Sequence, residues 1–429
     1  MRPWLPLLTA ALGCARAPSA DHSAQLSSFD YAWTRIRDTY PDPAMHGLDW
    51  AAVGAELRPR AEAAHTATEL RPVLEDLFAR LGDSHFGVIP GSLDLVATGR
   101  LSEAPLPLDR HGEAGLDVRV LDGHAVLSRV DPGGPADQAG LRPGMIVERV
   151  GDLELGPLIA RVAAEETEAR ALGLSLQRSV LARLCGPPGS TLTLRVRDGA
   201  DQAQDRTVTL ATQGATWTTL GSLPDVPVHF TTSRLGDVAL VRFDAFLDPV
   251  PSRWSEAMSG LQGVRGLVID LRGNPGGVAP MAMGMAGYLI PTRGQSLGTM
   301  RFREATLNLV VSPRTPQFTG PVAVLVDGLS ASSAEIFAAG LQKLGRATVF
   351  GEPSSGMALP STWERLPNGD LIQFVTADFT DPSGARIEAT GVVPDVVRPL
   401  TRAALLAGQD PALDAALAWI AERAAGGPP

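Results

Sequence analysis

The stretch G-L-S-A-S-S-A-E, from Gly328 to Glu335, joins two patterns of different period. An apolar run typical of a buried strand, 321–326, precedes it, and a helical pattern, 334–344, follows it. A strand-to-helix turn of small residues exposes its side chains and leaves the first N–H groups of the helix without intrahelical partners. Such a turn suits a nucleophile beside an oxyanion-binding site. Serine-rich turns are common, so the rest of the chain decides between a catalytic turn and an ordinary one.

The composition describes a globular protein that does not bind nucleic acid. The chain has 429 residues, enough for two or three domains, and is 44% apolar and 20% charged. Its net charge of −10 argues against nucleic acid or an anionic membrane surface as a partner, because phosphate binding needs clustered basic residues. Lys343 is the one lysine of the sequence.

The N-terminus resembles a bacterial lipoprotein signal. Arg2 is followed by an apolar run, 4–12, and then by Gly13 and Cys14. In such signals the cysteine becomes the lipidated N-terminus, which predicts a protein anchored in the cell envelope and facing the periplasm. An ordinary cleaved signal or a stray apolar N-terminus are the alternatives. No other stretch has the roughly 18 uninterrupted apolar residues of a transmembrane span.

Changes of pattern predict four parts along the chain. They are a signal and linker in 1–20, a helical domain in 21–100, a domain of short strands and turns in 101–213, and an α/β domain with a C-terminal helix in 220–429. Within the last part we expect a β-hairpin around 371–379. The segment 155–184 predicts an unusually long helix in the third part.

The third part carries a specific motif. The run P-G-G-P-A-D-Q-A-G-L-R-P-G-M-I-V, 132–147, closely resembles the hallmark of PDZ domains in bacterial proteases. In that family a glycine-containing loop before a strand caps a peptide's carboxylate with backbone N–H groups, and the peptide adds beside that strand. The best match to this loop is Gly115-Leu116-Asp117-Val118.

A second glycine-rich turn lies in the α/β part. The motif D-L-R-G-N-P-G-G, 270–277, ends an apolar strand and precedes a helical pattern at 278–289. Such a turn presents backbone N–H groups to an anion. Phosphate cradling or a plain tight turn are the alternatives, although the lysine of a Walker loop is missing.

Together these motifs resemble the C-terminal processing peptidase and tricorn core superfamily of serine peptidases. The resemblance covers about 25–400 and includes G-E-P-x-x-G from Gly351 and G-V-V-P-D from Gly391. It implies a ClpP/crotonase-like α/β catalytic core in 220–429, an inserted PDZ domain in 101–213 and an N-terminal helical domain. It also implies that no metal or organic cofactor is needed.

The superfamily divides by its general base. Processing peptidases use a lysine 25 residues after the serine, where this chain has Met357. Lys343 lies 11 residues after Ser332 on the same expected helix, about 16 Å away, which excludes a Ser–Lys dyad. The tricorn-like branch uses serine, histidine and an acid instead. Matching its motifs assigns these roles to Ser332, His85 and Glu388.

The same resemblance assigns the oxyanion donors, which are the N–H of Ser333 and that of Gly277 or Gly276. Other interpretations of the triad residues remain open. His85 also suits a capping or buried histidine, and Glu388 suits a solvated strand. Two neighbouring serines, Ser330 and Ser333, compete as nucleophile, but the motif places the nucleophile three residues before an acid, here Glu335.

The expected function is that of a serine endopeptidase of the tail-specific or tricorn type. A Ser-His-Glu triad would cleave peptides or unfolded protein C-termini, while the PDZ domain docks the free C-terminus of the substrate. A non-catalytic peptide- or lipid-binding protein on the same fold is the competing reading, because Met357 makes the pocket more apolar than a lysine would.

Overall fold

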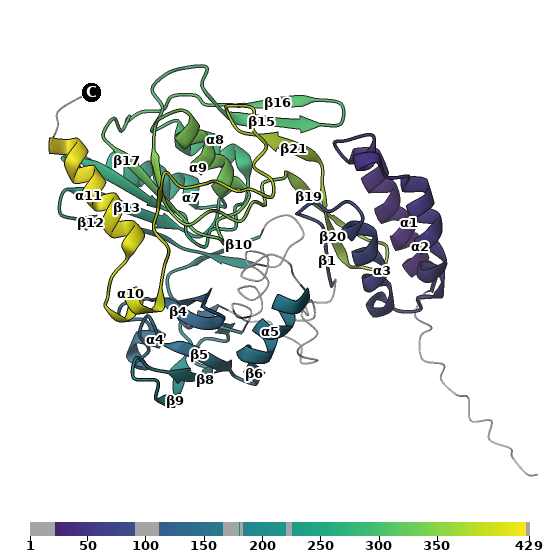
Figure 1. Cartoon of the computed structure of the whole chain (residues 1–429), viewed down its shortest axis with the longest axis horizontal. Coiled ribbons are helices and arrows are strands. Elements are labelled where there is room, and N and C mark those ends of the chain that lie inside the picture. The colour runs from purple at the N-terminus through teal and green to yellow at the C-terminus, as the bar shows by residue number, and fades with distance from the viewer. Residues whose placement is uncertain (1–21, 91–110, 166–179, 181–182, 220–224, 426–429) are drawn as a thin grey trace, which may run out of the picture.

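The computed structural model describes residues 22–90, 111–165, 180, 183–219 and 225–425, which form three parts in Figure 1. Three features expected from the sequence lie outside the described residues. They are Cys14, the start of the expected PDZ domain, and most of the part of the expected long helix that follows Glu165. Among the described residues, no helix combines the length and the apolar character of a membrane span.

The N-terminal part consists of three helices, α1 (His22–Thr39), α2 (Trp50–Ala63) and α3 (Ala67–Ala79). The side chain of Asp49 caps α2, and a capping box of Thr66 and Glu69 begins α3. The apolar faces of these helices pack against β20 (Leu371–Val375), which comes from the far end of the chain.

That contact determines where the histidine turn lies. The strand β20 is the middle of a three-stranded sheet between β1 (Gly87–Ile89) and β19 (Ser361–Arg365). In Figure 1 this sheet stands between the three helices and the rest of the molecule. The turn that carries His85 joins α3 to β1, so it is held beside residues near 358–375.

The middle part is a sheet of short antiparallel strands in the order β3-β4-β5-β8-β9, with β6 paired to β5. β3 lies at the end of this order, so one of its edges has no strand partner among the described residues. The bounds are β3 (Leu116–Leu121), β4 (His124–Val130), α4 (Pro135–Gln138), β5 (Ile146–Val150), β6 (Leu153–Glu154), α5 (Leu155–Glu165), β8 (Thr191–Arg197) and β9 (Ala203–Thr209). A short pair, β2 (Gly112–Glu113) and β7 (Cys185–Gly186), lies beside it.

The third part is built on a six-stranded sheet in which all strands except the first are parallel. Its order is β12 (Phe230–Leu235), β13 (Val238–Phe243), β14 (Gly266–Asp270), β17 (Val322–Val326), β18 (Thr348–Gly351) and β22 (Val396–Val397). The central strands read as continuous apolar runs because helices cover both faces of the sheet.

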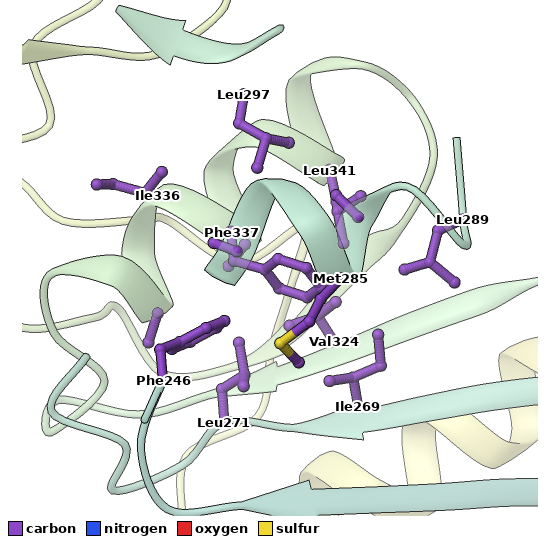
Figure 2. Close-up of a cluster of buried hydrophobic side chains, with 14 of the residues drawn as sticks. Phe246, Ile269, Leu271, Met285, Leu289, Leu297, Val324, Ile336, Phe337 and Leu341 are labelled. Carbon is purple, nitrogen blue, oxygen red and sulfur yellow. The ribbon is translucent and has the colours of Figure 1, made fainter. Parts of the chain in front are cut away.

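One face of this sheet packs against α7 (Val250–Ser259), α8 (Ala279–Ala286) and α9 (Ser333–Lys343). Figure 2 shows Phe337 and Met285 from these helices lying against Ile269 and Val324 of the strands. The opposite face packs against α11 (Pro411–Ala425). At Gly266 any Cβ would lie 2.2 Å from Ile420, so this helix approaches closely only because the residue is glycine.

The parallel order gathers the sequence motifs at one edge of the sheet. Loops at the carboxyl ends of adjacent parallel strands meet in the same crevice. Here β14 leads into the glycine-rich turn, β17 into the turn with Ser332, and β18 into the loop from Glu352 to Met357.

The hairpin expected around 371–379 lies earlier in the chain, over 361–375. β20 pairs with β19, whereas β21 (Ala377–Thr380) joins a different sheet with β15 (Ser296–Phe302) and β16 (Thr306–Val310). Only Thr376 separates β20 from β21, which is shorter than the two-residue loop of a tight hairpin. The remaining elements are η1 (Met45–Gly47), β10 (Thr216–Thr218), β11 (Val226–Val228) and α10 (Arg402–Leu406).

Candidate active site

Ser332 occupies a strained turn at the start of α9. Its backbone has φ 54° and ψ −118°, which residues with a side chain rarely adopt and which costs about 1–3 kcal/mol. The N–H of Ser332 donates to the carbonyl oxygen of Met357 at 2.8 Å and to Glu335 Oε2 at 3.0 Å. The backbone is therefore held from two sides, while the side chain stays half-buried at the edge of the sheet.

Glu335 fastens the loop after β18 to the nucleophile turn. Its fully buried carboxylate accepts the Ser354 hydroxyl at 2.5 Å and the N–H groups of Gly356 and Met357 at 2.8 Å and 3.0 Å. Burial raises the pKa of Glu335 to about 7, even though these donors act in the opposite direction. The acid of the S-A-S-S-A-E motif thus holds the turn in place.

The two neighbouring serines are engaged elsewhere. The hydroxyl of Ser330 donates to the Leu271 carbonyl at 2.8 Å, and that of Ser333 donates to the Gly277 carbonyl at 2.8 Å. Both residues are buried. Of the three candidate nucleophiles, Ser332 is the one that is partly exposed.

The glycine-rich turn lies directly against the nucleophile. A Cβ on Gly276 would be 2.7 Å from the Cβ of Ser332, and a Cβ on Gly277 would be 2.5 Å from the Phe246 carbonyl oxygen. Both residues also have positive φ, 97° and 138°. Only glycine therefore fits at either position. The buried side chain of Asn274 holds the turn by donating to the Phe243 carbonyl at 2.9 Å.

The two glycines differ in the state of their N–H groups. The Gly276 N–H donates to Asn274 Oδ1 at 2.9 Å. Among the residues that the structure describes, no acceptor lies within hydrogen-bond reach of the N–H of Gly277 or of Ser333. The sequence left Gly276 and Gly277 open as oxyanion donors, and this difference favours Gly277.

Glu388 is a buried acid with two backbone donors. Its side chain is 8% exposed, Oε1 accepts the Ser84 N–H at 3.0 Å, and Oε2 accepts the Ala358 N–H at 2.9 Å. Burial raises the pKa of Glu388, and hydrogen bonds from Ala358 and Ser84 oppose that rise. The solvated-strand alternative for this residue does not match its burial.

Ser84 connects the acid with the histidine. Its hydroxyl lies 2.8 Å from His85 Nδ1, while its N–H donates to Glu388. His85 itself has a positive φ of 62° in the turn before β1. No role of Ser84 is predicted from the sequence, although Ser84 directly precedes His85 in D-S-H-F.

Met357 and Ala358 bring the candidate residues into one region. The carbonyl of Met357 holds the N–H of Ser332, and the N–H of the next residue holds Glu388. Adjacent residues of one loop thus contact the nucleophile and the acid, while Ser84 links that acid to His85. No three His, Cys, Asp or Glu side chains of the described residues gather as a metal site.

The expected peptide-docking loop lies at the junction with the third part. Gly115 has φ 70° and precedes β3, the end strand of its sheet. Asp117 forms ion pairs with Arg129 at 2.9 Å and with Arg242 of β13 at 3.1 Å. Burial alone would raise the pKa of Asp117, but the surrounding arginines outweigh it and hold the pKa well below its usual range.

Comparison with known proteins identifies the class as a serine-type peptidase. Residues 237–398 match peptidase family S41, and residues 24–79 match the tricorn protease C1 domain. The chloroplastic C-terminal processing peptidase of Tetradesmus obliquus is 27% identical over 397 residues, covering 89% of this chain and 79% of the relative. The carboxyl-terminal-processing protease of Synechocystis is 27% identical over 378 residues, covering 85% and 79%.

The fold agrees with these matches. The photosystem II D1 C-terminal processing protease superposes with a TM-score of 0.57 at 23% identity, over 88% of this chain and 94% of that structure. The chain belongs to the C-terminal processing peptidase and tricorn core superfamily of serine peptidases. The expected superfamily, the α/β peptidase core and the peptidase class are therefore confirmed.

Proposed function

We propose that this chain is a serine endopeptidase in which Ser332, His85 and Glu388 form the catalytic triad. The observation that carries the proposal is Ser84, whose N–H donates to Glu388 and whose hydroxyl lies 2.8 Å from His85 Nδ1. This contact joins the histidine to a buried acid next to the nucleophile loop. The contact supports a role for His85 as a base whose orientation is fixed by a carboxylate. A serine nucleophile needs such a base to remove its proton.

The hydrogen bonds around Ser84 also favour one tautomer of the imidazole. A Ser84 hydroxyl that donates toward Glu388 accepts the Nδ1–H of His85, which leaves Nε2 unprotonated and able to accept the serine proton. Glu388 then stabilises the imidazolium that forms, acting through Ser84.

The reaction is acyl transfer in two halves. Ser332 Oγ attacks the peptide carbonyl while His85 takes its proton, and the N–H groups of Gly277 and Ser333 receive the oxyanion. The histidine returns that proton to the leaving amine as the C–N bond breaks. A water molecule, deprotonated by the same histidine, then attacks the acyl-enzyme, and Ser332 regains its proton.

The substrate is a peptide or a protein whose free C-terminus docks on the PDZ-type domain in 101–213. The support is the edge of β3, next to Gly115, Leu116, Asp117 and Val118, which no strand of the described residues pairs with, together with relatives named for processing at the carboxyl terminus. A peptide strand added there would lie close to the ion pair of Arg119 with Asp327, at 2.9 Å, where the middle part meets the core.

We place the protein in the cell envelope, facing the periplasm and held by a lipid on Cys14. The support is the sequence around Gly13 and Cys14. Replacement of Cys14 by Ser should move the protein from the detergent phase to the aqueous phase and abolish incorporation of labelled fatty acid. Wild-type protein that begins at another residue would rule out the anchor and leave the peptidase proposal intact.

A fluorophosphonate probe tests the catalytic proposal directly. Wild-type protein should be labelled at Ser332, and Ser332→Ala should not be labelled, because the probe needs an activated serine. Failure to label wild-type protein under conditions in which it is folded would favour the non-catalytic binding function instead. Ser330→Ala serves as the matched control, since its hydroxyl is bonded to the Leu271 carbonyl.

A further inference from the structure

Asp83, the residue before Ser84, is held by two distant parts of the chain. Its Oδ1 accepts Arg386 Nη2 at 3.1 Å, and its Oδ2 accepts the hydroxyl of Tyr40. The Asp83 side chain is only 8% exposed. The D-S-H-F motif assigns no role to this buried carboxylate. Hydrogen bonds to a buried carboxylate are about twice as strong as those between neutral groups.

The two partners come from segments that are far apart in the sequence. Tyr40 directly follows α1, and the centroid of its ring lies 6.3 Å from that of Phe86, the residue after His85. Arg386 lies two residues before Glu388 and also pairs with Asp378 at 2.8 Å. Asp83 therefore joins the N-terminal helices to the segment that carries the catalytic acid.

Three polar side chains surround the Asp83 carboxylate. Burial raises the pKa of Tyr40, and the hydrogen bond to Asp83 adds to that rise, as expected for a phenol that donates to a carboxylate. His46 Nε2 lies 2.6 Å from the same hydroxyl and 3.2 Å from Asp83 Oδ2. The guanidinium of Arg386 is the third group that contacts the Asp83 carboxylate.

These contacts act on a strained turn. His85 has a positive φ, a conformation that persists only where the surroundings enforce it. Asp83 is tied by its side chain and Ser84 by its N–H, so two consecutive residues fix the direction in which His85 leaves the backbone. A shift of about 1 Å in such a group can lower the rate about 100-fold.

We propose that Asp83 is the positioning residue of the histidine turn, acting through its contacts with Arg386 and Tyr40 to aim His85 at the nucleophile. The proposal rests on the proposed function, because it presumes that His85 is the base. Tyr40, Asp83 and Arg386 line a cavity of about 310 Å³. The ring of Tyr40 also packs in the core of the N-terminal helices, whereas its hydroxyl and the Asp83 carboxylate form the polar contact. Its removal should alter the catalytic step more than the fold.

The experiment measures kcat, KM and melting temperature for full-length Asp83→Ala, Asp83→Asn and Tyr40→Phe. We expect Asp83→Ala to lower kcat about 10- to 100-fold with KM unchanged, and Asp83→Asn, which keeps one acceptor, to recover part of that loss. Asp76→Ala is the matched control. Asp76 lies on α3, close to Asp83 in the sequence, but its carboxylate forms an exposed pair with Arg60.

The Tyr40→Phe substitution removes one hydroxyl and keeps the ring, so it decides the question if Asp83→Ala does not fold. It should lower kcat severalfold in the wild-type background and have no further effect beside Asp83→Ala, because both act through one contact. Wild-type kcat in Tyr40→Phe and Asp83→Asn would overturn the proposal. Wild-type kcat in His85→Ala would instead overturn the triad itself, which separates the two failures.

Discussion

The carbonyl oxygen of Met357 accepts the backbone N–H of Ser332 at 2.8 Å. Processing peptidases of the superfamily place a lysine base at this sequence position. In this chain the position acts through its backbone, since the N–H of Met357 also donates to Glu335 at 3.0 Å. Because both contacts use the backbone, any residue except proline can make them. The loop can therefore hold the nucleophile while the base comes from the histidine turn.

The first prediction concerns that base. His85→Ala should lower kcat about as much as Ser332→Ala, about 10⁴-fold or more, because members of a triad act as a unit. Glu388→Gln should lower it less, since the imidazole is still present. Hydrolysis of a peptide substrate by wild-type protein should rise through about pH 6 to 7, the range in which histidines ordinarily lose their proton.

Lys343→Arg is the matched control for this series. Lys343 ends α9 and is one helix length from Ser332, so its replacement should leave kcat unchanged. Near wild-type turnover in His85→Ala, together with an inactive Ser332→Ala, would show that another group is the base.

The second prediction is that Met357→Lys partly restores activity to His85→Ala. A lysine there would extend from a backbone already bonded to Ser332 and would stand near the carboxylates of Glu335 and Glu388. Those negative charges favour the protonated amine, so the rescued activity should appear only at alkaline pH, toward the ordinary lysine pKa of about 10.4. Met357→Leu beside His85→Ala should restore nothing.

The local pattern of the sequence was enough to predict the nucleophile turn. The apolar run and the helical spacing on either side of Ser332 correspond to β17 and α9, since both elements are built from the residues nearest to them. The contact of Ser84 with Glu388 lies beyond such reasoning, because it joins segments 304 residues apart. Tertiary contacts bring them together, among them the packing of β20 against the N-terminal helices and the ion pair of Asp83 with Arg386.

Two further features depend on tertiary structure. β20 and β21 are separated by a single residue, Thr376, yet β20 pairs with β19 and β21 pairs with β15, which lies about 80 residues earlier in the chain. The choice between Gly276 and Gly277 as oxyanion donor depends on where the side chain of Asn274 points. Neither can be read from residue spacing.

The third prediction concerns His229, which joins the middle part to the core. Its Nδ1 lies 2.6 Å from Asp244 and its Nε2 lies 3.2 Å from Glu113, so both nitrogens face carboxylates. Burial alone would lower the pKa of His229, but these two carboxylates outweigh it and raise the pKa to about 10. The folded chain therefore keeps a proton that the unfolded chain loses near pH 6.5.

It follows that this contact stabilises the protein fully below about pH 6.5 and that the contribution is lost as the pH rises toward about 10. His229→Gln should lower the free energy of unfolding by about 2 kcal/mol at pH 6. Thermal melts of both proteins between pH 5 and 10 should show the difference shrinking with rising pH. A difference that grows would contradict the assignment, and the exposed His124→Gln should show none.

The last prediction concerns the substrate. If backbone N–H groups at Gly115, Leu116, Asp117 and Val118 cap a carboxylate, full-length Ser332→Ala should bind a peptide with a free C-terminus more tightly than its amidated form. Loss of a charged hydrogen-bond acceptor should weaken binding about 10-fold or more. Fluorescence anisotropy of labelled peptide pairs measures this difference. Equal affinities for the two forms would show that the domain does not read C-termini and serves instead to brace the core through Asp117 and Arg242.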